Sequence, residues 1–413
     1  MENFGIARAP GLLVFGSGRR DALASVAATL GERALVCTDS RYQEDSTLRA
    51  MVESMRAAGI RTEVYDGTIA ELPLECIEAA VARARTFGPD MLVGLGGGSC
   101  IDLAKLVGVC LAHGGPLSQY YGEFRVPGPI MPVIAIPTTA GTGSEVTPVA
   151  VLADPGRAMK VGISSPYLVP AVALCDPELT LTCPPSLTAG SGADALTHAI
   201  EAFTTVRSPA AADTPMGKVF VGKNLFSDLY ARMAIEALAG NLARAVEDGQ
   251  DLQAREQVML GSLAAGMAFA AAGTAAAHAI QYPVGALTHT AHGPGVAALL
   301  PYVMEFNRPA CIEEFAQIAD LFEAAGAAAT GGTAEQRAAR AIDLVEALFR
   351  RIGIPASLEQ LGLAAGQCPE VAEQSLQAAR LVRNNPRPLD PESMKKIVAS
   401  AHAGRREQLR ETH

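Results

Sequence analysis

The sequence predicts an α/β domain built on a doubly wound parallel sheet, followed by an all-α domain. Its 413 residues are enough for two domains, and 49% of them are hydrophobic while only 18% are charged, which favours packed cores. Up to about residue 185, short apolar runs alternate with amphipathic stretches, whereas from Pro184 onward only helical patterns follow. Strand–helix alternation of this kind produces a parallel, Rossmann-like sheet. We therefore expect two domains, 1–184 and 185–413.

Each expected element rests on its hydrophobic period and on the residues that end it. In the first domain we expect strands over 11–16, 33–39, 61–67, 90–99 and 132–141, with helices over 20–31, 43–59, 74–87 and 100–112. The runs VAVLADP and ALCDPELT add a strand or hairpin near the domain junction. In the second domain a helix begins after the prolines at 184–185, and further helices cover 226–246, 251–272, 275–287, 310–325, 334–352, 356–363, 368–380 and 390–403.

Charge and cysteine content exclude several classes of protein. The net charge of −10 leaves no basic surplus to neutralise phosphates, so no nucleic-acid partner is expected. The eight cysteines form no CxxC pair, which fits reduced thiols in a cytoplasmic enzyme. The start, MENFGIARAP, has no basic segment followed by an apolar run, so we expect no signal peptide.

Two glycine-bearing loops follow predicted strands. In GLGGGSCIDLAK, the residues Gly96, Gly97 and Gly98 let the backbone approach a ligand, and Ser99 lies where a helix N-terminus favours a phosphate. By itself this is also an ordinary glycine turn, and it is not a GxGxxG motif. The segment IPTTAGTGSEVT offers Thr138, Thr139, Thr142 and Ser144 after a neighbouring strand. Two such loops at the carboxyl ends of parallel strands favour a dinucleotide crevice.

Asp39 closes the strand ALVCTD and allows two interpretations. It can accept hydrogen bonds from an adenosine ribose and repel a 2′-phosphate, or it can cap the helix that follows. The position alone does not choose between them.

The stretch HAIQYPVGALTHTAHG carries three of the seven histidines, within a span from Gln257 to Met304 that has no charged residue. A membrane span is disfavoured because the span is rich in Ala and Gly and is interrupted by Pro283 and Pro294. Two interpretations remain: a buried core helix with merely hydrogen-bonded histidines, and one half of a metal site.

A possible second half of that metal site lies in GADALTHAIEAF. Asp194 and His198 are four residues apart, so on a helix their side chains face the same way and can share a metal. His278 and His292 are too far apart for one helical face, and they converge only if the Pro283–Gly285 segment turns the chain back. A lone buried histidine is usually structural, but four such groups in apolar surroundings are costly unless they are paired or metal-bound.

The chain resembles the iron-containing (group III) alcohol dehydrogenases, which have a dehydroquinate synthase-like fold. The motifs that carry the resemblance are GLGGGSCIDLAK, IPTTAGTGSEVT, SSPYLVPAVALCDPELT, GADALTHAIEA and AHGPGVAALLPYVMEFN. The resemblance covers nearly all of the chain. It implies an NAD-dependent alcohol dehydrogenase or aldehyde reductase with a dinucleotide-binding domain at 1–184 and a metal- and substrate-binding domain at 185–413.

The resemblance also assigns residues. It implies that Fe²⁺, or sometimes Zn²⁺, is held by Asp194, His198, His278 and His292 in a dry cleft between the domains. It gives Gly97, Gly98 and Ser99 to the pyrophosphate, with Gly96 in the same loop, and Thr138, Thr139 and Thr142 to the phosphate and nicotinamide sides of NAD. It places Lys160 at the nicotinamide ribose and makes Asp39 the acidic residue that favours NAD over NADP.

Two features depart from the family pattern. Where many members have a further histidine four residues after the third ligand, this chain has Tyr282, a catalytic candidate that can hydrogen-bond but is a poor base, so a proton path through water or the ribose is favoured. The connection 207–227 is longer than in simple alcohol dehydrogenases and, with Tyr282, is similar to the hydroxyacid–oxoacid transhydrogenase branch. Lys218 and Lys223 in it are either contacts for a substrate anion or solvated surface.

Several hypotheses therefore stand side by side. The first is a metal-dependent NAD(H) oxidoreductase for a small primary alcohol or aldehyde, including one with an acidic group. The alternative is a transhydrogenase of the 4-hydroxybutyrate/2-oxoglutarate type that keeps its nicotinamide bound. A dehydroquinate synthase-like lyase needs more basic phosphate-binding residues, and a non-catalytic binding module would bind NADH but no metal. A homo-oligomer, by default a dimer, is expected.

Overall fold

The computed structural model describes residues 4–157, 159–209, 211 and 213–410, which form two compact units. The α/β unit comprises Arg8–Thr182 and Ala212–Val219, and the helical unit comprises Met1–Ala7, Cys183–Ala211 and Phe220–His413. The main division thus falls between Thr182 and Cys183, whereas the sequence placed the boundary at Pro184–Pro185. The segment that ends at Ala7 groups with the helical unit, and the segment Ala212–Val219 groups with the α/β unit.

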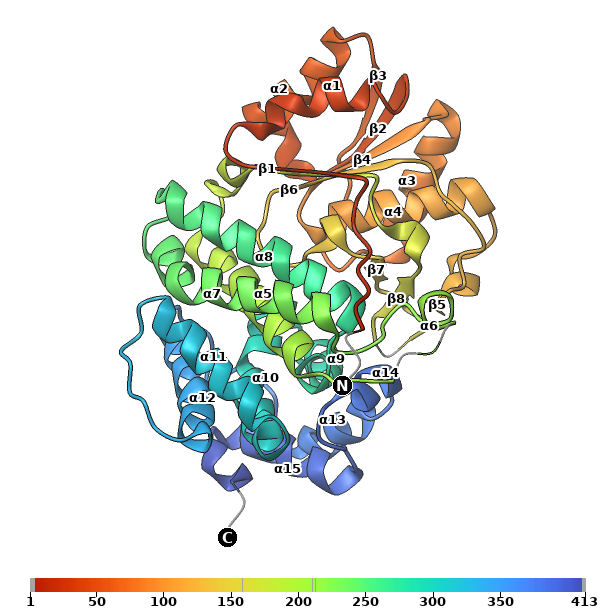
Figure 1. The fold of residues 1–413 in the computed structure, drawn as a ribbon. Helices are drawn as coiled ribbons and strands as arrows, with labels where there is room; N and C mark the ends of the chain where they lie inside the picture. The colour runs from red at the N-terminus through yellow and green to blue at the C-terminus, as the bar shows by residue number, and fades with distance from the viewer. Residues whose placement is uncertain (1–3, 158, 210, 212, 411–413) are drawn as a thin grey trace. The chain divides into compact units, whose positions relative to one another are not determined.

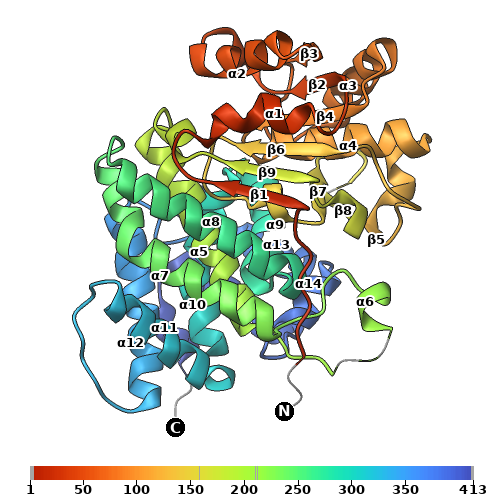
Figure 2. The ribbon, with the colours of Figure 1, turned by 45° about the horizontal axis from the view of Figure 1, so that its top comes forward.

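The α/β unit is built on a six-stranded sheet in the order β1-β9-β6-β4-β2-β3, in which every neighbouring pair is parallel (Figures 1 and 2). The predicted fold class is confirmed. Because the strands are parallel, the loops after β2, β4 and β6 all leave the same edge of the sheet, where open α/β sheets bind ligands. The strands are β1 Leu12–Phe15, β2 Arg33–Cys37, β3 Arg61–Tyr65, β4 Met91–Gly96, β6 Val133–Pro137 and β9 Val172–Cys175.

Helices cover both faces of this sheet. On one face α1 (Leu23–Ala27) and α2 (Ser46–Ala57) share a hydrophobic core with the strands. On the other face α3 (Leu74–Phe87) and α4 (Gly98–His113) form a second core with them. Buried on both sides, β4 and β6 consist almost wholly of apolar residues and glycine, as expected for central parallel strands.

A small second sheet lies beside α4 and was not predicted. It has the order β5-β8-β7, where β5 is Gly122–Glu123, β7 is Val149–Leu152 and β8 is Val161–Ser164. The run VAVLADP forms β7, which pairs antiparallel with β8, while the run ALCDPELT supplies β9 to the main sheet. The two runs near the domain junction therefore belong to different sheets and do not form one hairpin.

The helical unit follows the predicted pattern with three corrections. Helix α10 (His292–Asn307) was not predicted. No helix forms over 356–363, where the backbone makes successive turns and Gly362 adopts a φ of +89°. The predicted helix 368–380 is two helices, because the backbone leaves the helical region at Ala378 (ψ 56°). The helices are α5 Pro185–Thr204, α7 Leu225–Glu247, α8 Leu252–Ala272, α9 Ala276–Thr288, α10 His292–Asn307, α11 Ile312–Ala324, α12 Ala334–Arg351, α13 Cys368–Ser375, α14 Ala379–Asn384 and α15 Pro391–Ala403.

The charge-free stretch forms the interior of the helical unit. Most residues of α8, α9 and α10 are buried, and small side chains let these helices pack closely. No single helix within the described residues is long and apolar enough to cross a membrane; α8 and α9 pass that test by length and composition only as a pair, and the pair is bent by 102°.

The 207–227 connection contains the short helix α6 (Thr214–Gly217) and residues that group with the α/β unit. There the Val219 amide donates to Glu123, at 3.0 Å, and the Val219 carbonyl accepts from Arg8. An isolated antiparallel bridge pairs Arg207 with Gly222, so it joins residues near the two ends of this connection.

Candidate metal centre and dinucleotide loops

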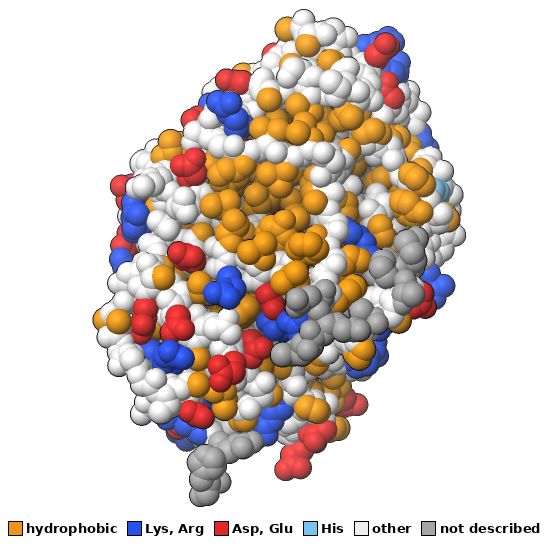
Figure 3. All heavy atoms as spheres, viewed as in Figure 1, with side chains coloured by type: hydrophobic (Ala, Val, Ile, Leu, Met, Phe, Trp, Pro, Cys, Tyr) orange, Lys and Arg blue, Asp and Glu red, His pale blue; other side chains and the backbone are white. Residues whose placement is uncertain are grey.

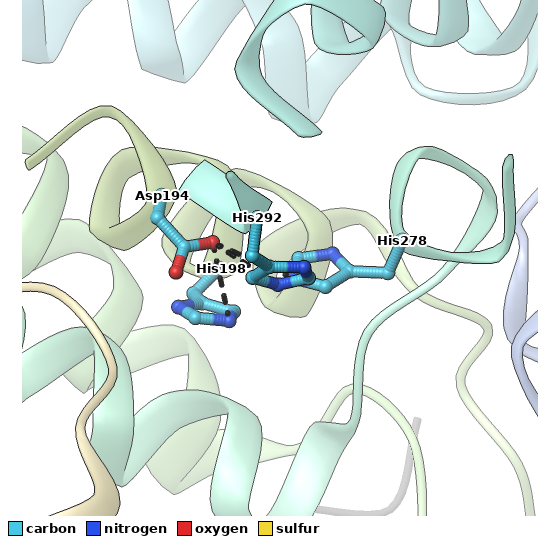
Figure 4. A group of neighbouring side chains, drawn as sticks. All are labelled: Asp194, His198, His278 and His292. Atoms are coloured by element: carbon cyan, nitrogen blue, oxygen red, sulfur yellow. Dashed lines mark ion pairs between the residues drawn. The ribbon is translucent and has the colours of Figure 1, made fainter. Parts of the chain in front are cut away.

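Three segments of the helical unit bring four potential metal ligands together (Figure 4). Asp194 and His198 lie one turn apart on α5, His278 lies in the first turn of α9, and His292 is the first residue of α10. Gly293 allows this approach, because a Cβ there would collide with the Gly190 carbonyl of α5. The side chains point toward one another, and one potential ligand atom from each residue lies within 4.8 Å of all the others.

The chain turns back after α9 and not where the sequence analysis placed the turn. Pro283 lies inside α9, which continues to Thr288, so the Pro283–Gly285 segment is helical. The reversal occurs at His289, whose φ of +55° is the left-handed conformation that commonly ends a helix. Helix α10 then begins at His292, and the two ligands meet across this turn.

The cluster has the spacing and the unsatisfied atoms of a metal site. The Nε2 atoms of His198, His278 and His292 lie 3.6, 3.7 and 3.8 Å from the same atom, Asp194 Oδ1. Two ligands of a tetrahedral ion at ~2.1 Å are about 3.4 Å apart, which is close to these three carboxylate–imidazole distances. Asp194 Oδ1 and His278 Nε2 are buried and have no hydrogen-bond partner. Such atoms are costly unless a ligand satisfies them.

Glu201 orients one of these histidines and was missed by sequence reasoning. Its carboxylate accepts hydrogen bonds from the backbone amides of Ala275 and Ala277, and His278 Nδ1 lies 2.6 Å from it. Because this carboxylate is an acceptor, Nδ1 carries the proton and donates, which leaves Nε2 to face the cluster. A carboxylate behind a metal-binding imidazole is a recurring arrangement. The signal was present in the sequence, since Asp194, His198 and Glu201 share one face of α5.

The charges within the cluster shift the pKa values of its members in opposite directions. Burial raises the pKa of Asp194, but the neighbouring imidazoles of His198, His292 and His278 outweigh it and hold that pKa well below the ordinary value. Burial lowers the pKa of His278, but Glu201 and Asp194 outweigh it and raise the pKa to about 9. A cation would take over the role of the proton between Asp194 and His278.

Tyr282 lies one turn after His278 on α9 and is half-buried. Burial raises its pKa above the ordinary value, and although Arg380 acts in the opposite direction, the carboxylates Glu201 and Asp194 raise it further. The phenol therefore stays protonated at neutral pH, where it can donate a hydrogen bond but cannot serve as a base.

In the α/β unit the two predicted loops touch each other at the carboxyl edge of the sheet. The Thr138 amide donates to the Gly96 carbonyl at 2.9 Å. A Cβ at Gly98 would lie 2.7 Å from the Thr142 side chain, and one at Gly97 would lie 3.7 Å from Thr139. Gly98 and Ser99 open α4, so the first amides of that helix face the edge, as a bound phosphate requires.

Gly96 must be glycine for two reasons. Its φ is +150°, and a Cβ there would lie 2.9 Å from the Cys100 Cβ. Asp39 lies close by. Its Oδ2 is 3.6 Å from the Cys100 thiol, and a Cβ at Gly96 would lie 3.5 Å from the same oxygen. The end of β2 and the first loop therefore form one continuous surface.

Asp39 caps a short 3₁₀ turn and not the helix that follows, whose N-cap is Asp45. Asp39 caps the 3₁₀ turn Ser40–Gln43 by accepting from the Arg41 amide, and its carboxylate forms a two-pronged pair with the Arg41 guanidinium at 2.7 and 2.8 Å. Burial raises the pKa of Asp39, but the Arg41 contacts outweigh it and lower that pKa. The carboxylate thus remains charged at this edge, and a ribose contact is compatible with the cap.

Comparison with known proteins decides the family. Residues 10–177 match the iron-containing alcohol dehydrogenase family, and residues 188–402 match the C-terminal domain of the same family. The chain belongs to the iron-containing alcohol dehydrogenases. It is an oxidoreductase of that family, as the motifs predicted.

Individual relatives cover almost the whole chain. Long-chain-alcohol dehydrogenase 1 of Geobacillus thermodenitrificans is 36% identical over 399 residues, which are 96% of each chain. The crystal structure of a 1,3-propanediol oxidoreductase has a TM-score of 0.89 at 34% identity and covers 96% of this chain and 100% of its own. The sulfoacetaldehyde reductase of Bifidobacterium kashiwanohense, solved in complex with NAD⁺, has a TM-score of 0.81 at 25% identity and covers 97% and 99%.

Of the three lysines that the sequence pointed to, the side chains of Lys160 and Lys223 have partners of their own in this dehydrogenase. Lys160, just before β8, forms an ion pair with Glu71. Lys223 is nearly buried: its ammonium donates to the Phe203 carbonyl at 2.7 Å and to Asp228 at 2.6 Å. Lys218 is exposed, and its backbone carbonyl accepts from Arg8. The structure gives Lys223 an anchoring role and not that of a contact for a substrate anion.

Proposed function

We propose that this dehydrogenase transfers hydride between NAD(H) and a small primary alcohol or aldehyde with the help of one divalent metal ion. The observation that carries the proposal is the buried cluster of Asp194, His198, His278 and His292, whose unsatisfied atoms face one another within a chain of known family. We assign NAD to the domain predicted at 1–184, and the metal and substrate to the domain predicted at 185–413.

The four side chains fit an Fe²⁺ or Zn²⁺ ion. One carboxylate and three imidazoles suit both metals, and the buried orphan atoms Asp194 Oδ1 and His278 Nε2 supply the reason to bind one. When bound, the ion supplies Lewis acidity, which lowers the pKa of an alcohol and polarises an aldehyde carbonyl. Glu201 fixes the tautomer and direction of His278, and three of the four side chains are buried among apolar helices while His292 is partly exposed.

The two loops of the α/β unit would hold the dinucleotide. Gly96, Gly97, Gly98 and Ser99 would contact the pyrophosphate through backbone amides, and Thr138, Thr139 and Thr142 would continue that surface toward the nicotinamide. Asp39, held as a carboxylate by Arg41, supports a preference for NAD over NADP because it would repel a 2′-phosphate. Lys160 remains our candidate for the nicotinamide ribose, and to reach it the side chain must release Glu71.

Tyr282 would act as a hydrogen-bond donor toward the substrate oxygen. Its raised pKa leaves it protonated at neutral pH, so the alcohol proton must leave through water or through the ribose hydroxyls of the dinucleotide. Substitution Tyr282→Phe should therefore reduce turnover moderately and leave the pH at which activity is half-maximal unchanged.

For the substrate we propose short-chain aldehydes, including acidic ones. The names of the relatives span long-chain alcohols, 1,3-propanediol and sulfoacetaldehyde, so they do not select one substrate. The alternative function is hydroxyacid–oxoacid transhydrogenation, which the long 207–227 connection and Tyr282 favour. The anchoring of Lys223 removes one support for recognition of an acid in that connection.

A multiple-turnover assay separates the two functions. Catalytic amounts of the metal-loaded enzyme are mixed anaerobically with NADH and a panel of aldehydes, semialdehydes and oxoacids, and the NADH absorbance is followed. We expect stoichiometric NADH oxidation with a short-chain aldehyde. Conversion of 4-hydroxybutyrate and 2-oxoglutarate without added cofactor, and with no multiple-turnover NADH oxidation, would establish the transhydrogenase instead.

We also propose a homo-oligomer, by default a dimer, in a reducing cytoplasmic compartment. Figure 3 shows hydrophobic side chains gathered on one face. On α7, the large hydrophobic side chains of Leu225, Phe226, Leu229 and Met233 are exposed. Apolar surface of this kind supports association with a second copy. Among the described residues, none of the eight cysteines forms a disulfide, which supports the reducing compartment. Light scattering during size-exclusion chromatography gives the mass that tests the oligomer.

A further inference from the structure

Lys105 is fully buried, and its charge lies in a cage of oxygen atoms. The residue belongs to α4, two turns after the first glycine loop. Its Nζ donates to the carbonyls of Ser144, Thr147 and Val149 at 2.7, 3.0 and 2.8 Å. It also contacts the Ser144 hydroxyl at 3.0 Å. Three of these oxygens belong to backbone that leads from the second loop into β7.

Asp102, one turn earlier on α4, completes the same connection. Its Oδ1 accepts from the Ser144 hydroxyl at 2.5 Å, and its Oδ2 accepts from the Val151 amide of β7 at 2.9 Å. The Ser144 hydroxyl therefore bridges Asp102 and Lys105. Two side chains of one helix thus fasten the segment from Ser144 to Val151.

This connection leads directly to both dinucleotide loops. The Ser144 amide donates to the Thr142 hydroxyl at 3.3 Å, and the Thr142 side chain lies against Gly98 at the start of α4. Lys105, Ser144, Thr142 and Gly98 therefore form a closed circuit within the α/β unit. If the Ser144 end of this circuit moves, the distance between the two loops changes.

The charge of Lys105 is retained because the cage satisfies it. Burial lowers the pKa of Lys105 to about 8, against the attraction of Asp102 and Glu145, so the ammonium predominates at neutral pH. An uncharged side chain of similar length would leave three buried carbonyls without their donor, which is costly. The hydrogen bonds of Lys105 therefore hold these three carbonyls in place.

We propose that Lys105 is a positioning residue for the dinucleotide: with Asp102 and Ser144 it sets the spacing between the loop at 96–99 and the loop at 138–142. Lys105 is fully buried, so it would act on the dinucleotide through Ser144 and Thr142. The proposal rests on the assignment of NAD to these two loops.

Two variants of this circuit and one matched control test the proposal. Ser144→Ala removes the bridging hydroxyl and leaves the ammonium in place, and Lys105→Met removes the ammonium. Lys223→Met is the control, because it removes a nearly buried lysine of the helical unit that also donates to a backbone carbonyl. For each protein we would measure the NADH dissociation constant by fluorescence, the KM for NADH, kcat at saturating NADH, and metal content.

We expect the dissociation constant and KM for NADH to rise about tenfold in Ser144→Ala and further in Lys105→Met. In Ser144→Ala, kcat at saturating NADH and metal content should stay near the wild-type values. Lys223→Met should lower the melting temperature but leave NADH binding unchanged. If Lys105→Met does not fold, Ser144→Ala decides the question alone.

Unchanged NADH binding in a folded Ser144→Ala would overturn the proposal. So would a loss of kcat and metal content with an unchanged KM for NADH, because that pattern indicates a purely structural role. Failure of the wild-type protein to bind NADH is a different outcome, which contradicts the assignment of the loops themselves.

Discussion

The helical unit and the α/β unit each bury a cluster of polar groups, and the clusters differ in whether those groups satisfy one another. In the helical unit, Asp194 Oδ1 and His278 Nε2 lie among the ligand atoms of the metal cluster and have no hydrogen-bond partner. In the α/β unit, Lys105 Nζ, Asp102 and Ser144 satisfy each other and the surrounding backbone. Unsatisfied buried atoms indicate a site that can bind a ligand, whereas a closed hydrogen-bond network indicates a group that holds neighbouring segments in place.

Removal of a ligand from the open cluster should have the largest effect. Asp194→Ala should lower kcat by at least about 1000-fold, because it removes the atom that all three imidazoles share. Metal content, measured by mass spectrometry, should fall in parallel while NADH still binds. His402→Ala, which removes a half-buried histidine of the same unit bonded to the Leu363 carbonyl, should leave metal content unchanged. Equal loss of metal and NADH binding would point to misfolding.

The buried network around Lys105 in the α/β unit predicts that the free energy of unfolding depends on pH. Glu145 is buried beside Lys105, and burial raises its pKa from 4.5 to about 7, although its own backbone amide and Lys105 act in the opposite direction. A carboxyl group whose pKa rises on folding stabilises the folded state below pH 4.5, and that contribution is lost as the pH rises through about 7. The wild-type protein should lose up to about 3 kcal/mol by this route.

The variant Glu145→Gln has no such titration, so its stability relative to wild type should increase between pH 4.5 and pH 7 and then stay level. Urea unfolding of both proteins at several pH values measures this difference. A difference that is the same at pH 4.5 and at pH 7.5 contradicts the role given to burial of Glu145.

Substitution of Glu201, which hydrogen-bonds to the candidate ligand His278, should have an intermediate effect on metal binding. Glu201→Gln keeps the size of the side chain but can no longer accept from both Ala275 and Ala277 and from His278 Nδ1. We expect metal affinity to fall about 10- to 100-fold, as for other partners behind metal ligands. The control is Glu305→Gln, an equally buried carboxylate of the same unit that pairs with Arg308 and Arg406. If both variants bind metal as wild type does, Glu201 has no role at the metal.

The smallest predicted effect concerns the choice of dinucleotide. Asp39→Gly removes the carboxylate that Arg41 engages and that would face a 2′-phosphate. We expect the efficiency with NADPH relative to NADH to rise about tenfold, mainly through KM. Steady-state kinetics with both cofactors measure the ratio. A wild-type protein that already prefers NADPH contradicts the role given to Asp39.

The sequence predicted the elements best where the local signals agree. Helix α3 occupies the predicted range, 74–87, because Pro73 precedes it and Gly88 ends it in the left-handed conformation. The reversal after α9 was misplaced because a proline such as Pro283 usually breaks a helix, yet it is tolerated when tertiary packing satisfies its surroundings. Local patterns do not report that packing.

The candidate site shows the same limit. The spacing of Asp194 and His198 predicts a shared helical face, and the charge-free surroundings made His278 and His292 candidates, but only the family resemblance assigned all four to one metal. Glu201 was missed although it shares a helical face with Asp194 and His198, and Lys105 was missed because a single charged residue in an apolar helix does not say whether it faces solvent or a buried partner. Their roles follow from contacts over long sequence separations, and such contacts emerge only when the chain is folded.

Metal stoichiometry, combined with NADH binding, tests the central claim most directly. The wild-type protein would be prepared without oxygen, stripped with a chelator and titrated with Fe²⁺ or Zn²⁺, with metal content and NADH fluorescence measured at each point. The open cluster predicts one ion per chain, activity that appears with that ion, and NADH binding that is present before it is added. Activity of the metal-free protein, or binding of a single ion that persists in Asp194→Ala, would contradict the account.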